Sequence, residues 1–334
     1  MMTQIAGAKK IPILLAQGTY GCVYNPGVQC GTNATLGKNF VTKIHRKAKY
    51  AEKEIHNSNK IKKLFKQHAK YFAISLDTCD VNVRQVSGNE MQKCDFIRES
   101  KETDPNVNEY KGLYVSTKMK FINGYTLADF LDELTTKIDS QIFSICKRLY
   151  VCVQKLQQLR IVHYDLKENN MIIKDNTGLP VLIDFGLSID MDKFLDKDGK
   201  LLSNVPFNTY SSSFYVYASD YVPWHIDIDI ICYIIQEIGE SRWTGSIDYR
   251  IIEKIFDEWN FSYTSRRSRL SVNQQKYWTR IRTFISKDII EECLPSRQKY
   301  LNMIQSLNIG NWKGLVEQLI LRWKIWDIYA ICVL

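Results

Sequence analysis

The sequence predicts an α+β protein with a small β-rich N-terminal part and a larger, mainly helical C-terminal part. Short apolar runs around glycine turns fill the first 45 residues, a pattern typical of strands and hairpins. Apolar residues with a helical period follow in 140–162, and the chain beyond about residue 222 keeps a helical pattern rich in Trp and Ile. We therefore expect an N-terminal lobe over 1–122 and a C-terminal lobe over 123–334.

The elements of the N-terminal lobe follow from the same patterns. ILLAQGTYGCVY (13–24) predicts two strands joined by a glycine turn, and KNFVTKIHR (38–46) predicts a third strand. Residues 51–72 predict a helix with an apolar stripe. The polar residues 77–110 predict a long surface loop, and 112–122 predict a further strand.

Composition limits the class of protein. Of the 334 residues, 45% are hydrophobic and 24% are charged, as in soluble globular proteins with a real core. No apolar run approaches the ~18–20 residues that cross a bilayer, and we interpret the apolar run near the N-terminus as a strand, not a signal peptide. The net charge of +9 suits an anionic partner. The basic stretches 60–70 and 264–269 fit solvated faces better than a nucleic-acid surface, so nucleic-acid binding is not expected.

The nine cysteines form no CxxC pair. This pattern favours a reduced compartment with buried or idle thiols, and it gives no support for a structural zinc site.

Two N-terminal motifs suggest phosphate binding. GTYGCVY (18–24) is a glycine turn between strands, where backbone N–H groups are able to approach phosphate oxygens. Lys43 ends the apolar run FVTK, and an acidic residue on the next helix would aim its ammonium group. Glu54 and Glu52 compete for that role, and we favour Glu54.

The segment HYDLKENN (163–170) carries the most specific pattern. Asp165 is suited to accept a proton from a hydroxyl nucleophile, and Lys167 to neutralise charge on a transferring group. Asn170 and Asp184, the latter in DFG (184–186), supply oxygen ligands of the kind that Mg²⁺ prefers. A β-hairpin formed by MIIK, DNTGLP and VLID would bring both oxygens to one metal ion.

Taken together, these motifs resemble the protein-kinase signature, which combines a glycine loop, a strand lysine, a helix glutamate, H-R-D-L-x-x-x-N and DFG. The resemblance covers roughly residues 14–190. It implies a two-lobed protein-kinase-like fold. The insertions and the C-terminal region look most like divergent Ser/Thr kinases of large cytoplasmic DNA viruses, the pox-, asfar-, irido- and mimivirus-like group.

The resemblance also implies a role for each matching residue. Asp165 would be the catalytic base, and Lys167 would contact the γ-phosphate. Lys43 would hold the α- and β-phosphates while paired with Glu54. Asn170 and Asp184 would bind Mg²⁺, with Mn²⁺ as an alternative. His163 would support the catalytic loop near Phe185. The residues implied in ATP binding are Ala16, Gly18, Thr19, Gly21, Val23, Val41, Lys43, Met119, Lys120, Ile122 and Ile172.

The sequence departs from the signature at two positions, of which Ala16 costs loop flexibility without abolishing nucleotide binding and Tyr164 affects the expected regulation. Ala16 replaces the first loop glycine, and Tyr164 replaces the arginine that reads a phosphate on the activation segment. We therefore expect activity without activation-segment phosphorylation, although Thr209, Tyr210 and Ser211–Ser213 are candidate acceptors.

The start of the central C-terminal helix has two candidates. Asp227 has the ordinary spacing after DFG, whereas Asp327 in WDIYAICVL fits the residue pattern better. We favour Asp327, which would make about 235–320 an insertion and end the chain inside that helix.

The sequence thus predicts a Ser/Thr protein kinase that transfers the γ-phosphate of ATP to protein hydroxyls, since a lysine at the position of Lys167 is typical of Ser/Thr specificity. The alternatives are a pseudokinase that serves as an ATP-binding scaffold and a small-molecule kinase of the aminoglycoside or choline type. The expected partners are ATP and protein substrates. The expected location is the cytoplasm. If the viral resemblance holds, this is the cytoplasm of an infected cell, with the virion as a further location.

Overall fold

The computed structural model describes residues 11–28, 39–86, 89–102, 112–132 and 138–334. The chain forms two compact units. Unit 1 comprises Met1–Asn123 together with Ile183–Leu187, and unit 2 comprises Gly124–Leu182 together with Ser188–Leu334. The segment Ile183–Leu187, which contains the DFG motif, is therefore described with unit 1.

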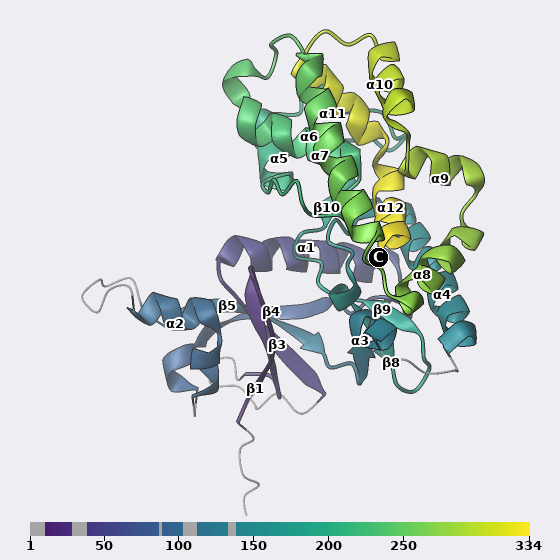
Figure 1. Ribbon diagram of the computed structural model, residues 1–334. Helices are drawn as coiled ribbons and strands as arrows, with labels where there is room; N and C mark the ends of the chain where they lie inside the picture. Colours follow the sequence, from purple (N-terminus) through teal and green to yellow (C-terminus); the bar gives the residue numbers. More distant parts are fainter. Residues whose placement is uncertain (1–10, 29–38, 87–88, 103–111, 133–137) are drawn as a thin grey trace, which may run out of the picture. The chain divides into compact units, whose positions relative to one another are not determined.

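The described part of unit 1 is built around an antiparallel sheet with the strand order β1-β2-β3-β5-β4 (Figure 1). Its strands are β1 (Ile13–Gly18), β2 (Gly21–Asn25), β3 (Phe40–His45), β4 (Ser75–Asn82) and β5 (Leu113–Lys120). The three strands predicted from 13–24 and 38–46 are confirmed as β1, β2 and β3, and the strand predicted within 112–122 is confirmed as β5.

Helix α1 (Ala48–Leu64) packs against β3, β4 and β5 of this sheet. Of the predicted apolar stripe Ile55, Ile61, Leu64 and Phe65, only Ile61 is buried, and Leu64 is 57% exposed. The buried face of α1 also carries Glu54, Asn57 and Ser58, so the stripe is wrong except at Ile61. The predicted helix over 51–72 is too long, because α1 ends at Leu64 and the short 3₁₀ helix η1 (His68–Lys70) follows it.

The predicted surface loop over 77–110 is wrong in its described part. Residues there form β4, the 3₁₀ helices η2 (Val83–Gln85) and η3 (Glu90–Lys93), and helix α2 (Asp95–Glu102). The residues of β4 alternate poorly between apolar and polar, so the local pattern did not indicate a strand. Its backbone is nevertheless paired along β5 from Ser75 to Asn82, and this tertiary pairing outweighs the weak local propensity.

A disulfide joins Cys22 of β2 to Cys94 in unit 1. Both cysteines lie in a buried apolar cluster with Tyr24, Ile44 and Ile97. The expectation of idle thiols is therefore wrong for this pair, which the fold brings together from positions 72 residues apart. In unit 2, by contrast, Cys146, Cys152, Cys232, Cys293 and Cys332 are buried free thiols, as expected.

Unit 2 is mainly helical, which confirms the α+β fold class together with the N-terminal sheet. Its strands are β6 (Gly124–Thr126), β7 (Ile161–Val162), β8 (Met171–Lys174), β9 (Pro180–Leu182) and β10 (Ile189–Asp190). Its α-helices are α3 (Leu127–Asp132), α4 (Ile138–Gln158), α5 (Phe207–Ser213), α6 (Ile226–Tyr233), α7 (Tyr249–Arg267), α8 (Val272–Ile281), α9 (Lys287–Cys293), α10 (Arg297–Ser306), α11 (Trp312–Leu321) and α12 (Trp326–Val333). Shorter helical turns are η4 (Glu168–Asn170), η5 (Met191–Lys193), the π-helical η6 (Ile234–Ile238), η7 (Glu240–Arg242), η8 (Arg282–Phe284) and η9 (Trp323–Ile325).

The core of unit 2 lies around α12, which contacts α4, α8 and α9. Every residue of α12 is buried, and so is nearly all of α6. Both helices are apolar on all sides, as expected for helices enclosed by others. Their three buried acids, Asp227, Asp229 and Asp327, are therefore unusual, because a buried charge is costly without specific partners.

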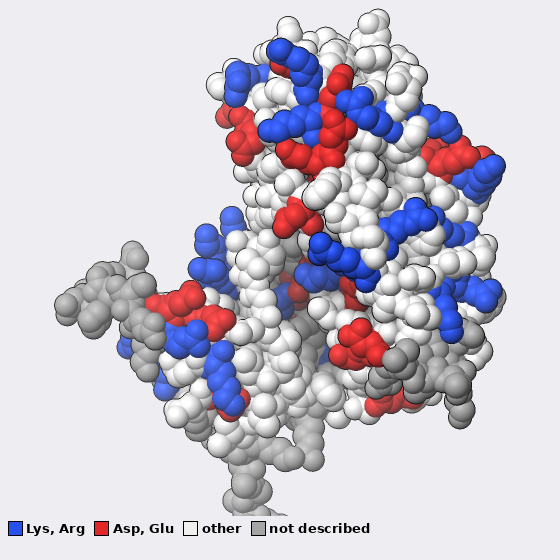
Figure 2. Space-filling view, viewed as in Figure 1, with Lys and Arg blue, Asp and Glu red and all other residues white. Residues whose placement is uncertain are grey.

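No helix in the described part of the chain is long and apolar enough to cross a membrane. On the face drawn in Figure 2, Lys and Arg side chains are intermixed with Asp and Glu and do not form a stripe of one sign. In unit 2, for example, Arg297 of α10 forms ion pairs with Glu253 and Asp257 of α7. On this face the positive charge is thus dispersed, in agreement with the scattered Lys and Arg of the sequence.

Candidate active site

The sheet of unit 1 gathers several predicted nucleotide-binding residues on one face. Val23 lies opposite Lys43, and Lys43 lies opposite Thr117. Val41 lies two residues before Lys43 and opposite Met119. Because side chains alternate along a strand, these two rows project from the same face of the sheet. The register of the strands thus brings Val23, Val41, Lys43 and Met119 together.

The glycine turn is a tight hairpin in which Gly18 pairs with Gly21 across Thr19 and Tyr20. A Cβ atom at Gly21 would lie 2.5 Å from the carbonyl oxygen of Ile44 on β3, so no side chain fits there. At Gly18 no heavy atom of the described structure lies within 4 Å of such a Cβ. The packing of β2 on β3 therefore requires glycine at position 21, a reason other than the phosphate contact inferred from the sequence. Ala16 and Thr19 are exposed on this hairpin.

Lys43 is held between two carboxylates in unit 1. Its Nζ lies 2.9 Å from Oε2 of Glu54 on α1 and 2.6 Å from Oδ1 of Asp184. Burial alone would lower the pKa of Lys43, but the charges of Asp184 and Glu54 outweigh burial and raise it. Lys43 is thus a fully charged, buried ammonium group in a fixed position. The pairing with Glu54 agrees with the sequence prediction, whereas Glu52 is exposed.

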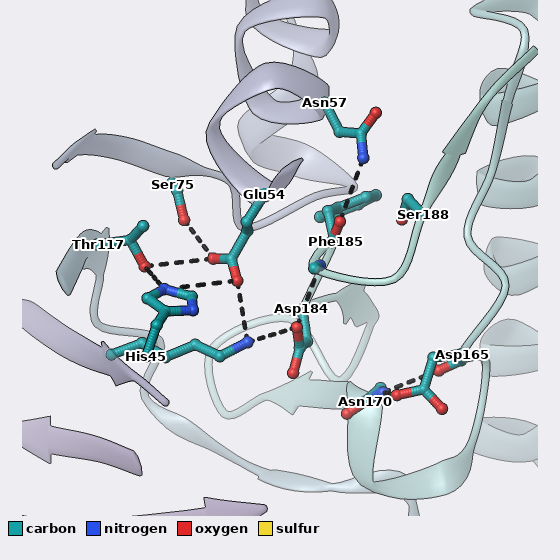
Figure 3. A network of polar contacts seen from close by, with 12 residues as sticks. His45, Glu54, Asn57, Ser75, Thr117, Asp165, Asn170, Asp184, Phe185 and Ser188 are labelled. Atoms are coloured by element: carbon teal, nitrogen blue, oxygen red, sulfur yellow. Dashed lines mark hydrogen bonds and ion pairs between the residues drawn. The ribbon is translucent and has the colours of Figure 1, made fainter. Parts of the chain in front are cut away.

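Glu54 is itself fixed by polar neighbours that sequence reasoning missed (Figure 3). Its Oε1 accepts hydrogen bonds from the hydroxyls of Ser75 and of Thr117, the second at 3.4 Å. His45 Nε2 contacts Thr117 Oγ1 at 2.9 Å and lies 4.0 Å from Glu54 Oε2. Burial lowers the pKa of His45 to about 4, so the ring is neutral at pH 7. These residues come from β3, β4 and β5, and no sequence spacing relates them.

The DFG segment is anchored to α1 of unit 1. Asn57 Nδ2 donates to the carbonyl oxygen of Phe185 at 3.3 Å, and the Phe185 ring meets Phe72 edge-on at 5.8 Å. Asp184 has a left-handed backbone (φ 64°), uncommon outside glycine and often found at functional sites. A Cβ at Gly186 would approach Asp184 Oδ1 at 3.2 Å and Glu54 Oε2 at 3.4 Å. Glycine there leaves room for the ion-paired carboxylates.

The catalytic-loop residues converge within unit 2. Asn170 Nδ2 donates to the backbone oxygen of Asp165 and to its Oδ2, both at 2.8 Å (Figure 3). Lys167 Nζ lies 3.1 Å from the same Oδ2. Asp165 Oδ1 accepts a hydrogen bond from the hydroxyl of Tyr221. The sequence predicted Asp165, Lys167 and Asn170 as a group. It gave no indication of Tyr221, which lies 56 residues beyond Asp165.

Asp327 supports this loop from the core of unit 2. Its carboxylate accepts hydrogen bonds from the backbone N–H groups of His163, at 2.7 Å, and of Tyr164, at 3.2 Å. Burial raises the pKa of Asp327, and His163 and the two backbone donors partly offset that effect. The carbonyl oxygen of His163 accepts a hydrogen bond from Ser188. Asp327, in the first turn of α12, is thus the candidate that contacts the catalytic loop, whereas its place at the start of a central helix stays a prediction.

Asp227 has a different set of partners. Its carboxylate accepts hydrogen bonds from Tyr300, Arg322 and Trp326, and it lies 3.2 Å from His225 Nδ1. Burial would raise its pKa, but His225, Arg322 and Tyr300 outweigh burial and lower it. Asp227 therefore links α6 to α10, α11 and α12 as a carboxylate, and it does not contact the catalytic loop.

Tyr164 is buried in an aromatic cluster and not directed at solvent. Its ring centroid lies 5.0 Å from that of Trp224 and 6.0 Å from that of Phe214, and its hydroxyl contacts Cys232 Sγ at 3.0 Å. Burial raises the pKa of Tyr164, so the phenol is neutral. An uncharged, enclosed side chain has no means to pair with a phosphate.

The other predicted residues are distributed over both units. Lys120 ends β5 and is exposed, and Ile122 is half-buried. Ile172 lies on β8, which pairs with β9 as the predicted hairpin. Asn170 and Asp184 belong to different units, so their joint metal site stays a prediction. Among the proposed acceptors, Tyr210 and Ser213 are buried.

Comparison with known proteins identifies the family. Residues 28–209, more than half of the chain, match the RIO domain. The chain belongs to the RIO domain family. This family lies within the atypical protein kinases, and its members are kinase-like proteins that in general use ATP and a divalent metal. The matched part of this RIO domain includes Lys43, Glu54, Asp165, Asn170 and Asp184.

The chain also resembles curated proteins, two of which are named as kinases. It is 28% identical over 131 residues to the EKC/KEOPS complex subunit bud32 of Dictyostelium discoideum, a match covering 38% of this chain and 52% of that protein. It is 25% identical over 233 residues to death-associated protein kinase 2 of Mus musculus and of Homo sapiens, covering 64% of this chain and 60% of theirs. The chain thus spans between half and two thirds of the length of these relatives.

Proposed function

We propose that this RIO domain is a Ser/Thr protein kinase that transfers the γ-phosphate of ATP to protein hydroxyls with Mg²⁺. The observation that carries the proposal is the buried Lys43 ammonium held by Glu54 and Asp184. Such a fixed charge is suited to the α- and β-phosphates, because a preorganised cation costs no rearrangement when charge develops. The relatives that are themselves named as kinases support the same proposal.

Asp165 and Lys167 would act on the acceptor and on the transferred group. A general base needs to lie within hydrogen-bond reach of the proton that it accepts, and Asp165 already accepts one hydroxyl hydrogen bond. Lys167, 3.1 Å from Asp165, would neutralise charge on the γ-phosphate. Asn170 orients Asp165 through its two hydrogen bonds.

The donor set fits a hard divalent cation. Both hydrogen bonds of the Asn170 side chain use its amide nitrogen, which directs the carbonyl oxygen away from Asp165. Asp184 supplies a carboxylate that is one-third exposed. Mg²⁺ is commonly bound by one or two such oxygens together with substrate phosphates. Asn170 and Asp184 would hold the ion, which when bound would neutralise charge on the phosphates.

The test is a transfer assay with Mg²⁺, labelled ATP, a basic protein, a set of peptides and small amines. We expect transfer to Ser or Thr that falls by at least about 100-fold in Asp165→Ala and in Lys43→Met, because each substitution removes a group required for transfer. Undiminished transfer in both variants would contradict the site assignment. Transfer to the small amines would indicate a small-molecule kinase, and stabilisation by ATP without any transfer would indicate a scaffold.

We also propose that activity does not require a phosphate on the activation segment, because Tyr164 stands where an arginine would read it. Inactive dephosphorylated protein that regains turnover when Thr209 or Ser211–Ser213 is phosphorylated would overturn this. We further propose that the chain is related to the Ser/Thr kinases of large cytoplasmic DNA viruses. A cytoplasmic location is likewise a proposal.

A further inference from the structure

Tyr221 places its hydroxyl at the carboxylate that we propose as the catalytic base. The phenol donates to Asp165 Oδ1, whereas Oδ2 is occupied by Asn170 and Lys167. Tyr221 therefore uses the carboxylate oxygen that the other catalytic-loop residues leave open. A hydroxyl within hydrogen-bond reach of a general base is in the position of an acceptor substrate.

The neighbours of Tyr221 hold it firmly in this position. Its backbone N–H donates to Ala218, and its carbonyl oxygen accepts from the backbone of Trp224, both at 3.0 Å. The rings of Tyr221 and Trp224 meet edge-on with centroids 5.0 Å apart. The Trp224 indole in turn donates to the carbonyl oxygen of Tyr164 at 2.8 Å. Tyr221 is thus part of a turn that is tied to the catalytic loop itself.

Tyr221 presents a protonated hydroxyl to Asp165. Burial and the charge of Asp165 raise the pKa of Tyr221, so the phenol keeps its proton and donates it in the hydrogen bond. A lysine or arginine in this place would neutralise Asp165 as an ion pair and would offer no hydroxyl. The contact that exists is the one a base makes with a nucleophile before proton transfer.

We propose that Tyr221 is the chain's own phosphate acceptor and is phosphorylated within the same molecule at Asp165. The proposal rests on the proposed kinase function, with ATP as donor. The Tyr221 oxygen forms a bond to the γ-phosphorus while the bond from that phosphorus to the β,γ-bridging oxygen breaks. The phenol proton passes to Asp165, and the electron pair of the broken bond leaves with ADP. Intramolecular placement compensates for an acceptor that is not Ser or Thr.

The product has a consequence for Asp165. A phosphate on Tyr221 carries about two negative charges and is repelled by a carboxylate. Arg266, in the basic stretch 264–269, already acts on the Tyr221 phenol through its positive charge and forms an ion pair with Glu168. A phosphate on Tyr221 would therefore be repelled by Asp165 and attracted by the charge of Arg266.

The experiment is to incubate the full chain with Mg²⁺ and ATP and to map phosphate by peptide mass spectrometry over time. We expect Tyr221 to be the first residue modified. Its rate constant should stay the same over an approximately 100-fold dilution of the protein, since an intramolecular step does not depend on concentration. Tyr217→Phe, at another partly buried tyrosine of the same segment, is the matched control and should still be modified at Tyr221.

A second arm separates reaction within a molecule from reaction between molecules. Tagged Asp165→Ala protein, first shown to be folded by circular dichroism, is mixed with the unmodified chain. Tyr221 of the tagged protein should stay unphosphorylated, and its modification would overturn the proposal. Transfer to added proteins with Tyr221 unmodified would also overturn it while leaving the proposed function intact. Failure of the chain both to transfer phosphate and to be stabilised by ATP would reject the proposed function, and this inference with it.

Discussion

Lys43 illustrates how neighbours determine the chemistry of a single side chain. A buried lysine by itself tends to lose its charge, but two carboxylates keep this one protonated. The sequence indicated the Glu54 partner, because Glu54 begins the pattern EIHNSNKI on the helix that follows the lysine strand, although Glu52 competed for the role. It gave no indication of Ser75 or Thr117, because their contacts with Glu54 depend on the pairing of β3, β4 and β5.

Glu54→Gln tests the ion pair directly. The amide keeps the size of the side chain but removes the charge that opposes Lys43, so we expect a loss of about 1–3 kcal/mol in unfolding free energy. Phosphate transfer should fall at least tenfold, because Lys43 loses one of its two fixed partners. Chemical denaturation and transfer kinetics measure the two effects. Glu52→Gln, on the exposed face of the same helix, is the control, and equal effects of both changes would contradict the assignment.

Tyr164 and Tyr221 show the limit of motif reasoning at the residue scale. The motif identified Tyr164 as a departure, but only the structure shows it enclosed by Trp224 and Phe214. Tyr221 belongs to no motif. Its contact with Asp165 arises from a turn whose position is set by the tertiary packing of Trp224.

At the scale of elements, α12 connects the core of unit 2 to the catalytic loop. Asp327→Asn should reduce the unfolding free energy by about 1–3 kcal/mol, because the amide group replaces one of the two acceptor atoms for His163 and Tyr164. Transfer should also weaken, since Asp165 follows Tyr164 directly in the loop. Asp288→Asn alters an exposed acid in the first turn of α9 and is the control. Unfolding followed by tryptophan fluorescence is suitable, and a wild-type stability of Asp327→Asn would exclude the supporting role.

Helix α6 contains a buried acid that should make stability depend on pH. Asp229 is buried, and its Oδ1 has no hydrogen-bond partner among the described residues. Burial, reinforced by Glu258 and Asp220, raises its pKa well above the ordinary 3.8. The folded state therefore holds a proton that the unfolded state releases, and the contribution of Asp229 to stability declines as the pH rises above about 4.

Asp229→Asn removes this titration while keeping the shape of the neutral acid. We expect the variant and the wild type to be about equally stable near pH 4, and the variant to be more stable by about 1–3 kcal/mol at pH 7–8. Urea unfolding at several pH values measures the difference. A difference that does not change with pH would mean that Asp229 does not titrate as described.

Element prediction was most accurate where local pattern and tertiary environment agree. Strands β1, β2, β3 and β5 carry clear periodicity, and so does helix α4, although it ends at Gln158 and the last residues of the predicted 140–162, Ile161–Val162, form β7. Strand β4 and helix α2 were missed because their residues are mostly polar and their stability comes from pairing with β5 and from packing near Cys94.

At the scale of the whole molecule, the disulfide should make the stability of unit 1 sensitive to reduction. Cys22 and Cys94 are 72 residues apart, and closing a loop of that length stabilises the folded state by up to about 4 kcal/mol in the chain-entropy view. We expect Cys22→Ser and Cys94→Ser each to destabilise unit 1, and the double variant to be little worse than either. Reducing agent should remove most of the difference from wild type.

The stability of each unit can be measured separately. All seven Trp residues lie in unit 2, so tryptophan fluorescence reports that unit alone, and hydrogen exchange in β2 and α2 reports unit 1. Strictly additive effects of the two serine substitutions, unaffected by reductant, would argue against the disulfide.

The sequence by itself determined the α+β class, strands β1, β2, β3 and β5, helices α1 and α4 in part, the helical character of the C-terminal region, and the motif residues Lys43, Glu54, Asp165, Asn170 and Asp184. These follow from local periodicity and from residue types at fixed spacings, which are properties of neighbouring positions in the chain. Tertiary structure alone decided the support of the catalytic loop by Asp327, the Cys22–Cys94 disulfide and the contact of Tyr221 with Asp165. These contacts join residues 56 to 164 positions apart, and only packing determines which of the many distant polar groups meet.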